Sequence, residues 1–317
     1  MRRPGVRRAA VLAMALCVAV SASSCTSDDG WSAPAAGSSP AAGVGEVAAD
    51  APPTRHTGPQ GRAAQFVTDC EHSHSAPDDP IVHAGYPGRS HLHDFFGNTS
   101  TDAGSTLATL LEGDTTCQMQ HDTASYWAPA LLDHGVAVTP KSSTAYYRVA
   151  PGVDPSQVRA YPAGLMVVAG DMTATATTAQ STDLAGWTCG VSTTHHASPP
   201  NCPPTSPLRG VITFPDCWNG SDLDSVDHRS HMANSVDGTC PASHPVHVPQ
   251  LTFAITYPIT GTEHDLTLSS GSVHGLHSDF FNAWDQDQLV REVESCLHRD
   301  AVCGLASNRA EDPLFSG

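Results

Sequence analysis

Proline and glycine are spread so densely along this chain that most of it cannot form long helices. The 317 residues include 25 Pro and 26 Gly, and both residues interrupt regular structure. Between them lie short runs rich in apolar and β-branched residues, a pattern typical of strands. We predict strands at 145–149, 164–168, 210–214, 250–257 and 265–268. In the fourth run two kinds of side chain alternate, as in a strand with one buried face.

One segment, 285–297, is predicted to be helical. Its residues Leu289, Val290, Val293 and Leu297 recur at intervals of three and four, which places them along one helix face. Short strands with a single helix favour an all-β-dominated fold. We expect an antiparallel β-sandwich or jelly roll with long loops and one short C-terminal helix. Loops on such a rigid frame are the usual place for functional sites.

The two ends of the chain differ in composition from its middle. Four arginines precede a short apolar run, which predicts a signal peptide at 1–24. Residues 25–62 are rich in Ala, Gly, Ser and Pro, and such a stretch predicts a flexible spacer. We therefore expect one disulfide-bonded, β-rich domain at 63–303 and a tail at 304–317.

Two forms of export fit this start. Small residues lead up to Cys25, so lipidation of that cysteine would tether the protein to the outer face of the membrane. Cleavage after Ala22 would instead release it. We expect either a cell-surface lipoprotein or a secreted protein.

Cysteine usage fits an oxidising compartment. Without Cys17 of the signal and Cys25, an even number of eight remains, which suits complete pairing. Eight cysteines allow 105 connectivities. Pairing neighbours in sequence gives Cys189–Cys202, Cys217–Cys240, Cys296–Cys303 and Cys70–Cys117.

The charge of the chain excludes a nucleic-acid partner. The 15 basic residues less the four signal arginines leave 11 against 32 acidic ones, a formal charge of −21. Binding to phosphates needs a basic face, and an anionic membrane surface would also repel this chain. Solubility is the simplest reason for the acidity.

Histidine clusters are the main functional signal, because the chain has 18 His but a single Lys. In the stretch 90–98, His91 and His93 would share one face of an extended segment. That arrangement suits two ligands on one metal ion, with Asp94 orienting a ring nitrogen. The alternative is that both imidazoles bond to loop carbonyls. His83 could be folded back toward them by the glycines that follow it.

A second cluster spans 217–231. On a helix, Asp224, Asp227, His228 and His231 would line one face and could hold a divalent cation. An oxygen-rich calcium loop is a second interpretation, although the full twelve-residue pattern is missing. The third is a capped, solvated turn held by a Cys217 disulfide.

Two further sets of residues could act on a substrate. Prolines bracket His244 and restrict its backbone. His277 and Asp279 form an acid/base pair near Trp284, and tryptophan beside carboxylates is typical of sugar-binding clefts. Core packing is the commoner use of Trp.

The motifs agree in order with a known family of secreted bacterial and fungal proteins. The chain resembles the domain-of-unknown-function family nineteen-ninety-six from about residue 66 to 284. The resemblance implies an extracellular, disulfide-bearing domain. In fungi, such domains often stand beside modules thought to bind glycans. It supplies neither a reaction nor catalytic residues. The matching stretches are 79–82, 90–93, 96–98, 126–129, 217–220, 227–231, 240–245 and 277–280.

Two functions of different class follow. The first is a metal-assisted hydrolase or lyase that acts on an extracellular polysaccharide or cell-wall polymer, with zinc or copper as cofactor. The second is a non-catalytic cell-surface module that binds a glycan or a transition metal. For the enzyme we expect metal ligands His91, His93, His228 and His231, catalytic residues Asp279, His277, Asp227 and His244, and substrate-binding residues Trp127, Trp284 and Tyr126.

Overall fold

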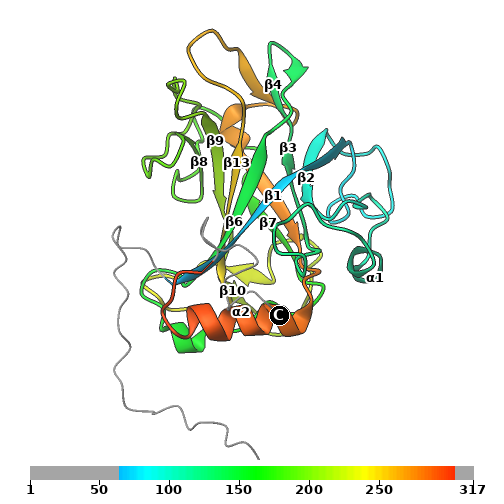
Figure 1. Cartoon of the computed structure of the whole chain (residues 1–317), viewed down its shortest axis with the longest axis vertical. Coiled ribbons are helices and arrows are strands. Elements are labelled where there is room, and N and C mark those ends of the chain that lie inside the picture. The colour runs from blue at the N-terminus through cyan, green and yellow to red at the C-terminus, as the bar shows by residue number, and fades with distance from the viewer. Residues whose placement is uncertain (1–63, 304–317) are drawn as a thin grey trace, which may run out of the picture. The chain divides into compact units, whose positions relative to one another are not determined.

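The computed structural model describes residues 64–303, and Figure 1 shows this part as a β-rich domain. The expected signal peptide, spacer, Cys25 and tail lie outside the described residues. Within 64–303, no helix has the length and apolar character needed to cross a bilayer.

A nine-stranded antiparallel sheet forms the frame of the domain, as the strand pattern predicts. The sheet curls so that its edge strand β7 packs against β9 near the other edge. In spatial order, the strands are β7 (Met166–Gly170), β15 (His277–Phe281), β3 (Ser125–Pro129), β2 (His93–Gly97), β1 (Gln65–Ala76), β6 (Ser142–Arg148), β13 (Gln250–Thr256), β9 (Leu208–Thr213) and β8 (Ala185–Cys189).

Two small three-stranded sheets stand beside the large one. All five strands predicted from sequence exist, with ends displaced by three residues or fewer. The first small sheet has the order β11 (Met232–Ala233), β10 (Cys217–Trp218) and β12 (Val246–His247), and the second has β14 (Leu266–Leu268), β4 (Leu131–Asp133) and β5 (Val136–Ala137).

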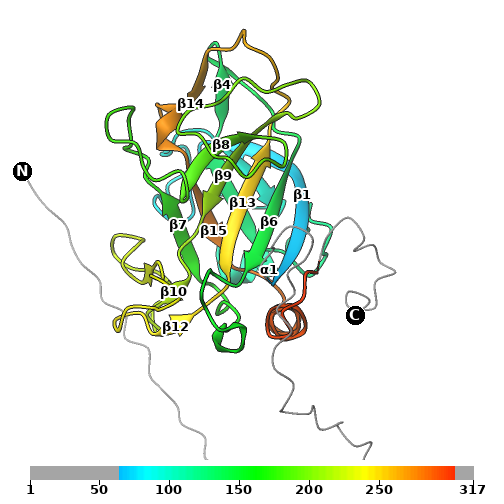
Figure 2. The ribbon, with the colours of Figure 1, turned by 90° about the vertical axis from the view of Figure 1, so that its left-hand side faces the viewer.

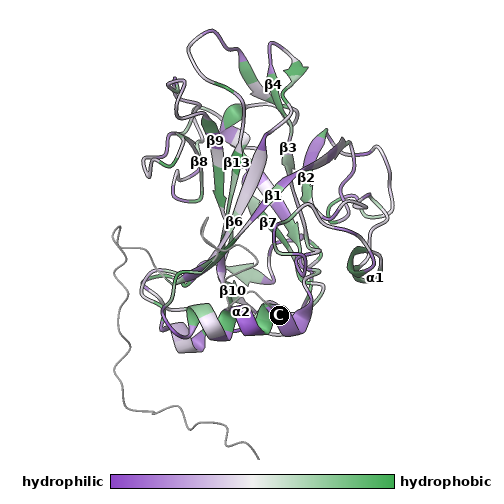
Figure 3. Cartoon of the chain, in the orientation of Figure 1, coloured by the Kyte–Doolittle hydropathy of each residue, from purple (hydrophilic) through white to green (hydrophobic). Residues whose placement is uncertain are grey.

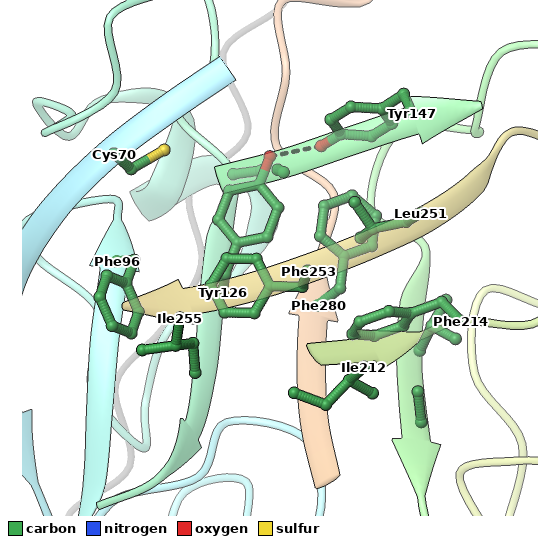
Figure 4. Close-up of a cluster of buried hydrophobic side chains, with 14 of the residues drawn as sticks. Cys70, Phe96, Tyr126, Tyr147, Ile212, Phe214, Leu251, Phe253, Ile255 and Phe280 are labelled. Carbon is green, nitrogen blue, oxygen red and sulfur yellow. Dashed lines mark hydrogen bonds between the residues drawn. The ribbon is translucent and has the colours of Figure 1, made fainter. Parts of the chain in front are cut away.

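Alternation along the strands separates a core face from an outer face. In β6, Ser143, Ala145 and Tyr147 are fully buried, whereas the residues between them are partly exposed. Figure 4 shows the buried face, where aromatic rings from several strands meet. Tyr126 stacks on Phe253 with 5.2 Å between ring centres. The core therefore lies inside the curl of the sheet.

The helical segment closes one end of this core. Helix α2 (Gln286–Glu292) begins where the Asp285 carboxylate accepts a hydrogen bond from Gln288 N at 2.9 Å. A π-helical turn, Val293–Leu297, continues it. Figure 3 shows apolar and polar residues alternating along α2, and its apolar side is buried against the core. The other helical segments are α1 (Leu107–Leu111) and the 3₁₀ turns Pro155–Gln157 and Val273–Gly275.

Four disulfides cross-link the described domain, and each connects the pair expected from proximity in sequence. They are Cys70–Cys117, Cys189–Cys202, Cys217–Cys240 and Cys296–Cys303. This degree of cross-linking is typical of proteins from an oxidising, extracellular environment.

Candidate functional site

Three strands bring the histidines of the stretch 90–98 close to His277 and Asp279, on the face of the sheet opposite the main core. Pro129 of β3 lies opposite His93 of β2. On the other side of β3, Asp279 pairs with Trp127, and continuing this register by two residues brings His277 opposite Pro129. The row His93–Pro129–His277 places the two imidazoles on either side of a compact residue. Side chains two positions apart on a strand share a face, so Asp279 lies on the same side.

His91 completes a group of three imidazoles. Its ring centre lies 4.2 Å from that of His93 and 5.2 Å from that of His277. One ligand nitrogen from each of the three rings lies within 4.8 Å of the others. The expected ligands His91 and His93 are thus joined by His277, to which the sequence pattern assigns a catalytic role.

Backbone carbonyls fix which ring nitrogen faces inward. His93 Nδ1 donates to Asp78 O at 2.8 Å, and His277 Nδ1 donates to Gly275 O at 2.7 Å. A neutral imidazole that donates from Nδ1 keeps its lone pair on Nε2. Within the part of the chain described, the buried Nε2 atoms of His91 and His93 have no hydrogen-bond partner. Leaving a buried polar atom unpaired costs roughly 1–3 kcal/mol, so these atoms are suited to an external ligand.

The spacing of the nitrogens suits a small cation. Two nitrogens that bind one tetrahedral zinc ion at about 2.1 Å lie about 3.4 Å apart. The three ligand nitrogens lie within 4.8 Å of one another, so small rotations of the rings would bring them to this spacing. His93 and His277 are 0% and 4% exposed, whereas His91 is partly exposed, so solvent reaches the group from the side of His91.

Two carboxylates adjoin the imidazoles. Asp79, His93 and Asp279 also bring one ligand atom each within 4.8 Å of one another. Both carboxylates are nearly inaccessible, at 4% and 2% exposure. The Asp279 Oδ1 atom has no hydrogen-bond partner among residues 64–303. Asp79 was missed by the sequence reasoning as a site residue, because its position reads as a turn: its Oδ1 accepts from Ile81 N and Val82 N, both at 2.9 Å.

Burial sets the charge state of this group. Desolvation lowers the pKa of His91 to about 4, with further lowering by the charges of His277 and His83. Burial likewise holds the pKa of His93 well below its usual value and lowers that of His277. Burial, and then the charge of Asp79, raise the pKa of Asp279 well above its usual value. At neutral pH the three rings are thus neutral, which is the form that ligates metals.

The second histidine cluster was expected to supply metal ligands, but its histidines lie outside the group formed by His91, His93 and His277. Residues 221–231 form turns, so the predicted helix is wrong. The nitrogens of His231 lie 2.9 Å from Ser225 Oγ and 2.6 Å from Met166 O, so both already have partners. His228 Nδ1 bonds to Asp224 Oδ2 at 2.9 Å. Charges from this cluster still reach the site: that of His228 opposes the rise that burial causes in the pKa of Asp79, and that of Arg229 contributes to lowering the pKa of His277 and opposes the rise in that of Asp279.

Asp227 and His244 stabilise the same turns. The N–H of Ser230 and the hydroxyl of Ser225 donate to Asp227 Oδ1 at 2.8 Å each, and these bonds lower the pKa of Asp227 below its usual range. His244 Nε2 donates to Ser230 O at 2.9 Å. This arrangement corresponds to the capped, solvated turn, with the Cys217–Cys240 disulfide beside it.

The three aromatic residues expected to bind substrate are buried: Tyr126 and Trp284 lie in the main core, and Trp127 lies in a second buried cluster with Phe95 and Phe281 on the histidine side of the sheet. Trp127, Trp284 and Tyr126 are each 0% exposed, so none presents a ring face to a sugar in this structure. Trp284 Nε1 donates to Tyr147 OH at 3.0 Å, and Tyr126 OH donates to Asp122 Oδ2 at 2.7 Å. Core packing, the commoner use of such rings, is what the fold requires here.

The domain is thus a disulfide-linked antiparallel β protein with three converging imidazoles on the outside of its large sheet. Residues 79–284 match the family model described as Domain of unknown function (DUF1996), and the chain belongs to this family. No curated protein and no solved structure matches it.

Proposed function

We propose that this domain binds a divalent transition metal, zinc or copper, at His91, His93 and His277. The observation that carries the proposal is the convergence of three imidazoles, two of which have buried, unpartnered Nε2 atoms among the described residues. Imidazole suits both metals. Three protein ligands with a fourth position left for substrate or water is the usual arrangement of a catalytic zinc site.

We further propose that the site serves a metal-assisted hydrolase or lyase. A bound ion would supply Lewis-acid polarisation of a substrate oxygen. Asp279 would hold or accept the proton, since one of its carboxylate oxygens lies in the same group as His93 and its buried Oδ1 has no hydrogen-bond partner among the described residues. A carboxyl group with a raised pKa is suited to proton transfer near neutral pH. His91, the partly exposed ligand, lies on the side from which substrate enters.

The proposed substrate is an extracellular polysaccharide, and the proposed location is outside the cell, either as a lipoprotein through Cys25 or as a secreted protein. The four disulfides support an oxidising compartment. The competing function is a non-catalytic surface module that binds metal or glycan, which the same three histidines would equally serve.

Metal content tests the first step. Untagged protein is produced with its own signal segment, purified from the exported fraction and analysed by elemental mass spectrometry. We expect about one zinc or copper per chain in the wild type and loss of it in His91→Ala/His93→Ala. The matched double variant His228→Ala/His244→Ala should keep its metal. Protein without stoichiometric metal, or with metal retained in the first double variant, would contradict the site.

Turnover tests the second step. Wild type and Asp279→Asn, both loaded with metal, are incubated with a panel of neutral and uronic-acid polysaccharides. New reducing ends report cleavage of either kind, and an unsaturated non-reducing end distinguishes elimination from hydrolysis. We expect product from the wild type and at least a hundredfold less from Asp279→Asn, as is typical when a general acid or base is removed. Metal binding without product from any polymer would favour the non-catalytic module.

A further inference from the structure

A wide hollow lies on the outer face of the other half of the sheet. Its floor is formed by β1, β6, β13 and β9, which Figure 2 shows side by side. The hollow has a volume of about 1090 Å³, which is large enough for an extended ligand. The histidine site stands on β2 and β15, so the two features occupy the outer faces of different strands.

Short side chains form the centre of the hollow's floor. Strand register aligns Asp69, Thr144, Ala254 and Val211 in one row across the four strands. One neighbouring row carries Tyr146, the aromatic residue among those that line the hollow, and the other carries Arg209. Most other members of these two rows are short, so the floor is broad and long side chains rise from it at only a few points.

Side chains with unpaired donors line this hollow. Gln65 is 2% exposed, and its Nε2 has no hydrogen-bond partner within residues 64–303. Its Oε1 accepts from Arg148 Nε at 2.9 Å, and the Arg148 guanidinium lies 4.5 Å from the ring centre of Tyr146. The Nε of Arg209 is likewise buried and unpartnered in the described chain. Both nitrogens are shielded from solvent, so Gln65 and Arg209 would donate to a ligand oxygen by turning their side chains toward the hollow that they line.

The charges that line the hollow indicate whether it suits a charged or an uncharged polymer. The acidic residues Asp69 and Glu71 and the basic residues Arg148 and Arg209 all line the hollow, so their charges balance although the whole chain carries −17. The rest of the lining is mainly hydroxyl and amide side chains. Such a surface neither attracts a polyanion nor selects a polycation, whereas it matches the hydroxyl and ring oxygens of an uncharged sugar chain.

We infer that this hollow is a binding surface for a neutral polysaccharide strand. The strand lies across β1, β6, β13 and β9, receives hydrogen bonds from Gln65 and Arg209, and packs one sugar ring against Tyr146. The surface holds the domain on its polymer. It does not depend on the metal at the histidine site, so it stands whether or not that site is catalytic.

Retardation in native gels cast with polymer tests the inference, with laminarin, mixed-linkage β-glucan, dextran, galactomannan and polygalacturonate as probes. We expect at least one neutral polymer to slow the wild type. Tyr146→Ala should weaken binding about tenfold, a reasonable loss for one ring contact. Ala254→Arg, which fills the centre, should abolish it.

Thr267→Ala, an exposed change on β14, is the control and should bind as the wild type does. Thermal unfolding checks that each variant is folded, and Tyr146→Ala decides the matter if Ala254→Arg fails to fold. His91→Ala/His93→Ala should bind normally, which separates this surface from the proposed metal site. Retardation by polygalacturonate alone, by no polymer, or to an equal degree in Tyr146→Ala and the wild type would overturn the inference.

Discussion

His91 and His277 meet edge to face, with 5.2 Å between ring centres and 76° between ring planes. The two residues come from opposite ends of the matched domain, and His277 begins the strand β15. Their contact places a loop residue over the sheet. Several measurements follow from this arrangement.

Zinc should stabilise the folded domain through these rings. A ligand at a hundred times its dissociation constant adds about 2.7 kcal/mol when it binds only the native state. We expect zinc to raise the melting temperature of chelator-treated wild type. In His277→Ala the zinc-induced shift should fall to nearly zero, whatever the melting temperature of the variant itself. His244→Ala, with its ring bonded to Ser230 O, should show the full shift.

The buried carboxyl of Asp122 should make stability depend on pH. Burial raises the pKa of Asp122 to about 8, although hydrogen bonds from Tyr126 and Ala124 oppose this. The folded state therefore holds a proton that the unfolded state releases above about pH 4. The protonated Asp122 therefore contributes fully to stability below the pKa that its carboxyl has in the unfolded chain. This contribution is lost as pH rises through the pKa of Asp122 in the folded protein, near 8.

Guanidinium unfolding at pH 5, 7 and 9, with chelator present, measures this effect. We expect the free energy of unfolding of the wild type to fall across the series and that of Asp122→Asn to fall less. The amide keeps the shape of the protonated acid and cannot ionise. Equal slopes for the two proteins would show that Asp122 does not titrate in this range.

The disulfides that close the longest and the shortest loop should contribute differently to the free energy of unfolding. Cys70–Cys117 closes a separation of 47 residues and Cys296–Cys303 one of 7. Chain entropy predicts about 4 kcal/mol for the first and about 2 kcal/mol for the second. Replacing each pair by alanine and measuring chemical unfolding tests the order. A larger loss from the Cys296–Cys303 pair would show that native packing, rather than loop entropy, dominates.

Local patterns in the sequence were enough for one part of this fold. Alternation located β13, and intervals of three and four located α2 with its π-helical continuation. Proximity in sequence located the disulfides, because short separations favour closure. The longest strand, β1 (Gln65–Ala76), gave no such signal. Its residues mix polar and apolar types without regular alternation, and its pairing with β2 is irregular between His72 and His74.

The candidate site was predictable only in part. His91 and His93 share a face through local geometry, so spacing alone revealed them. His277 joins them across β3, and the order of β2, β3 and β15 in the sheet is a property of the whole fold. The residues 224–231 carry the same Asp and His types, yet they bond to one another and to nearby backbone. Composition therefore could not distinguish a turn from a ligand set.

Gly97 offers a final test, of how tightly the strands below the site are packed. Gly97 and Gly135 both have positive φ, at 76° and 78°, so any side chain strains the two backbones to a similar extent. The two positions differ in the room that they leave for a side chain. A Cβ at Gly97 would collide with the Ala124 carbonyl oxygen and press on the Tyr126 ring, whereas one at Gly135 would meet nothing within 4 Å.

We therefore expect Gly97→Ala to cost about 1–3 kcal/mol more than Gly135→Ala, the range for overpacking a filled interior. Because the strain from positive φ is common to both, the difference isolates the collision. Chemical unfolding of the two variants measures it. Gly97 ends β2, the strand that begins with His93, so displacement there should also reduce the zinc-induced thermal shift. Equal losses in the two variants would mean that β2 and β3 can separate freely, and a pre-formed metal site would then lack its rigid support.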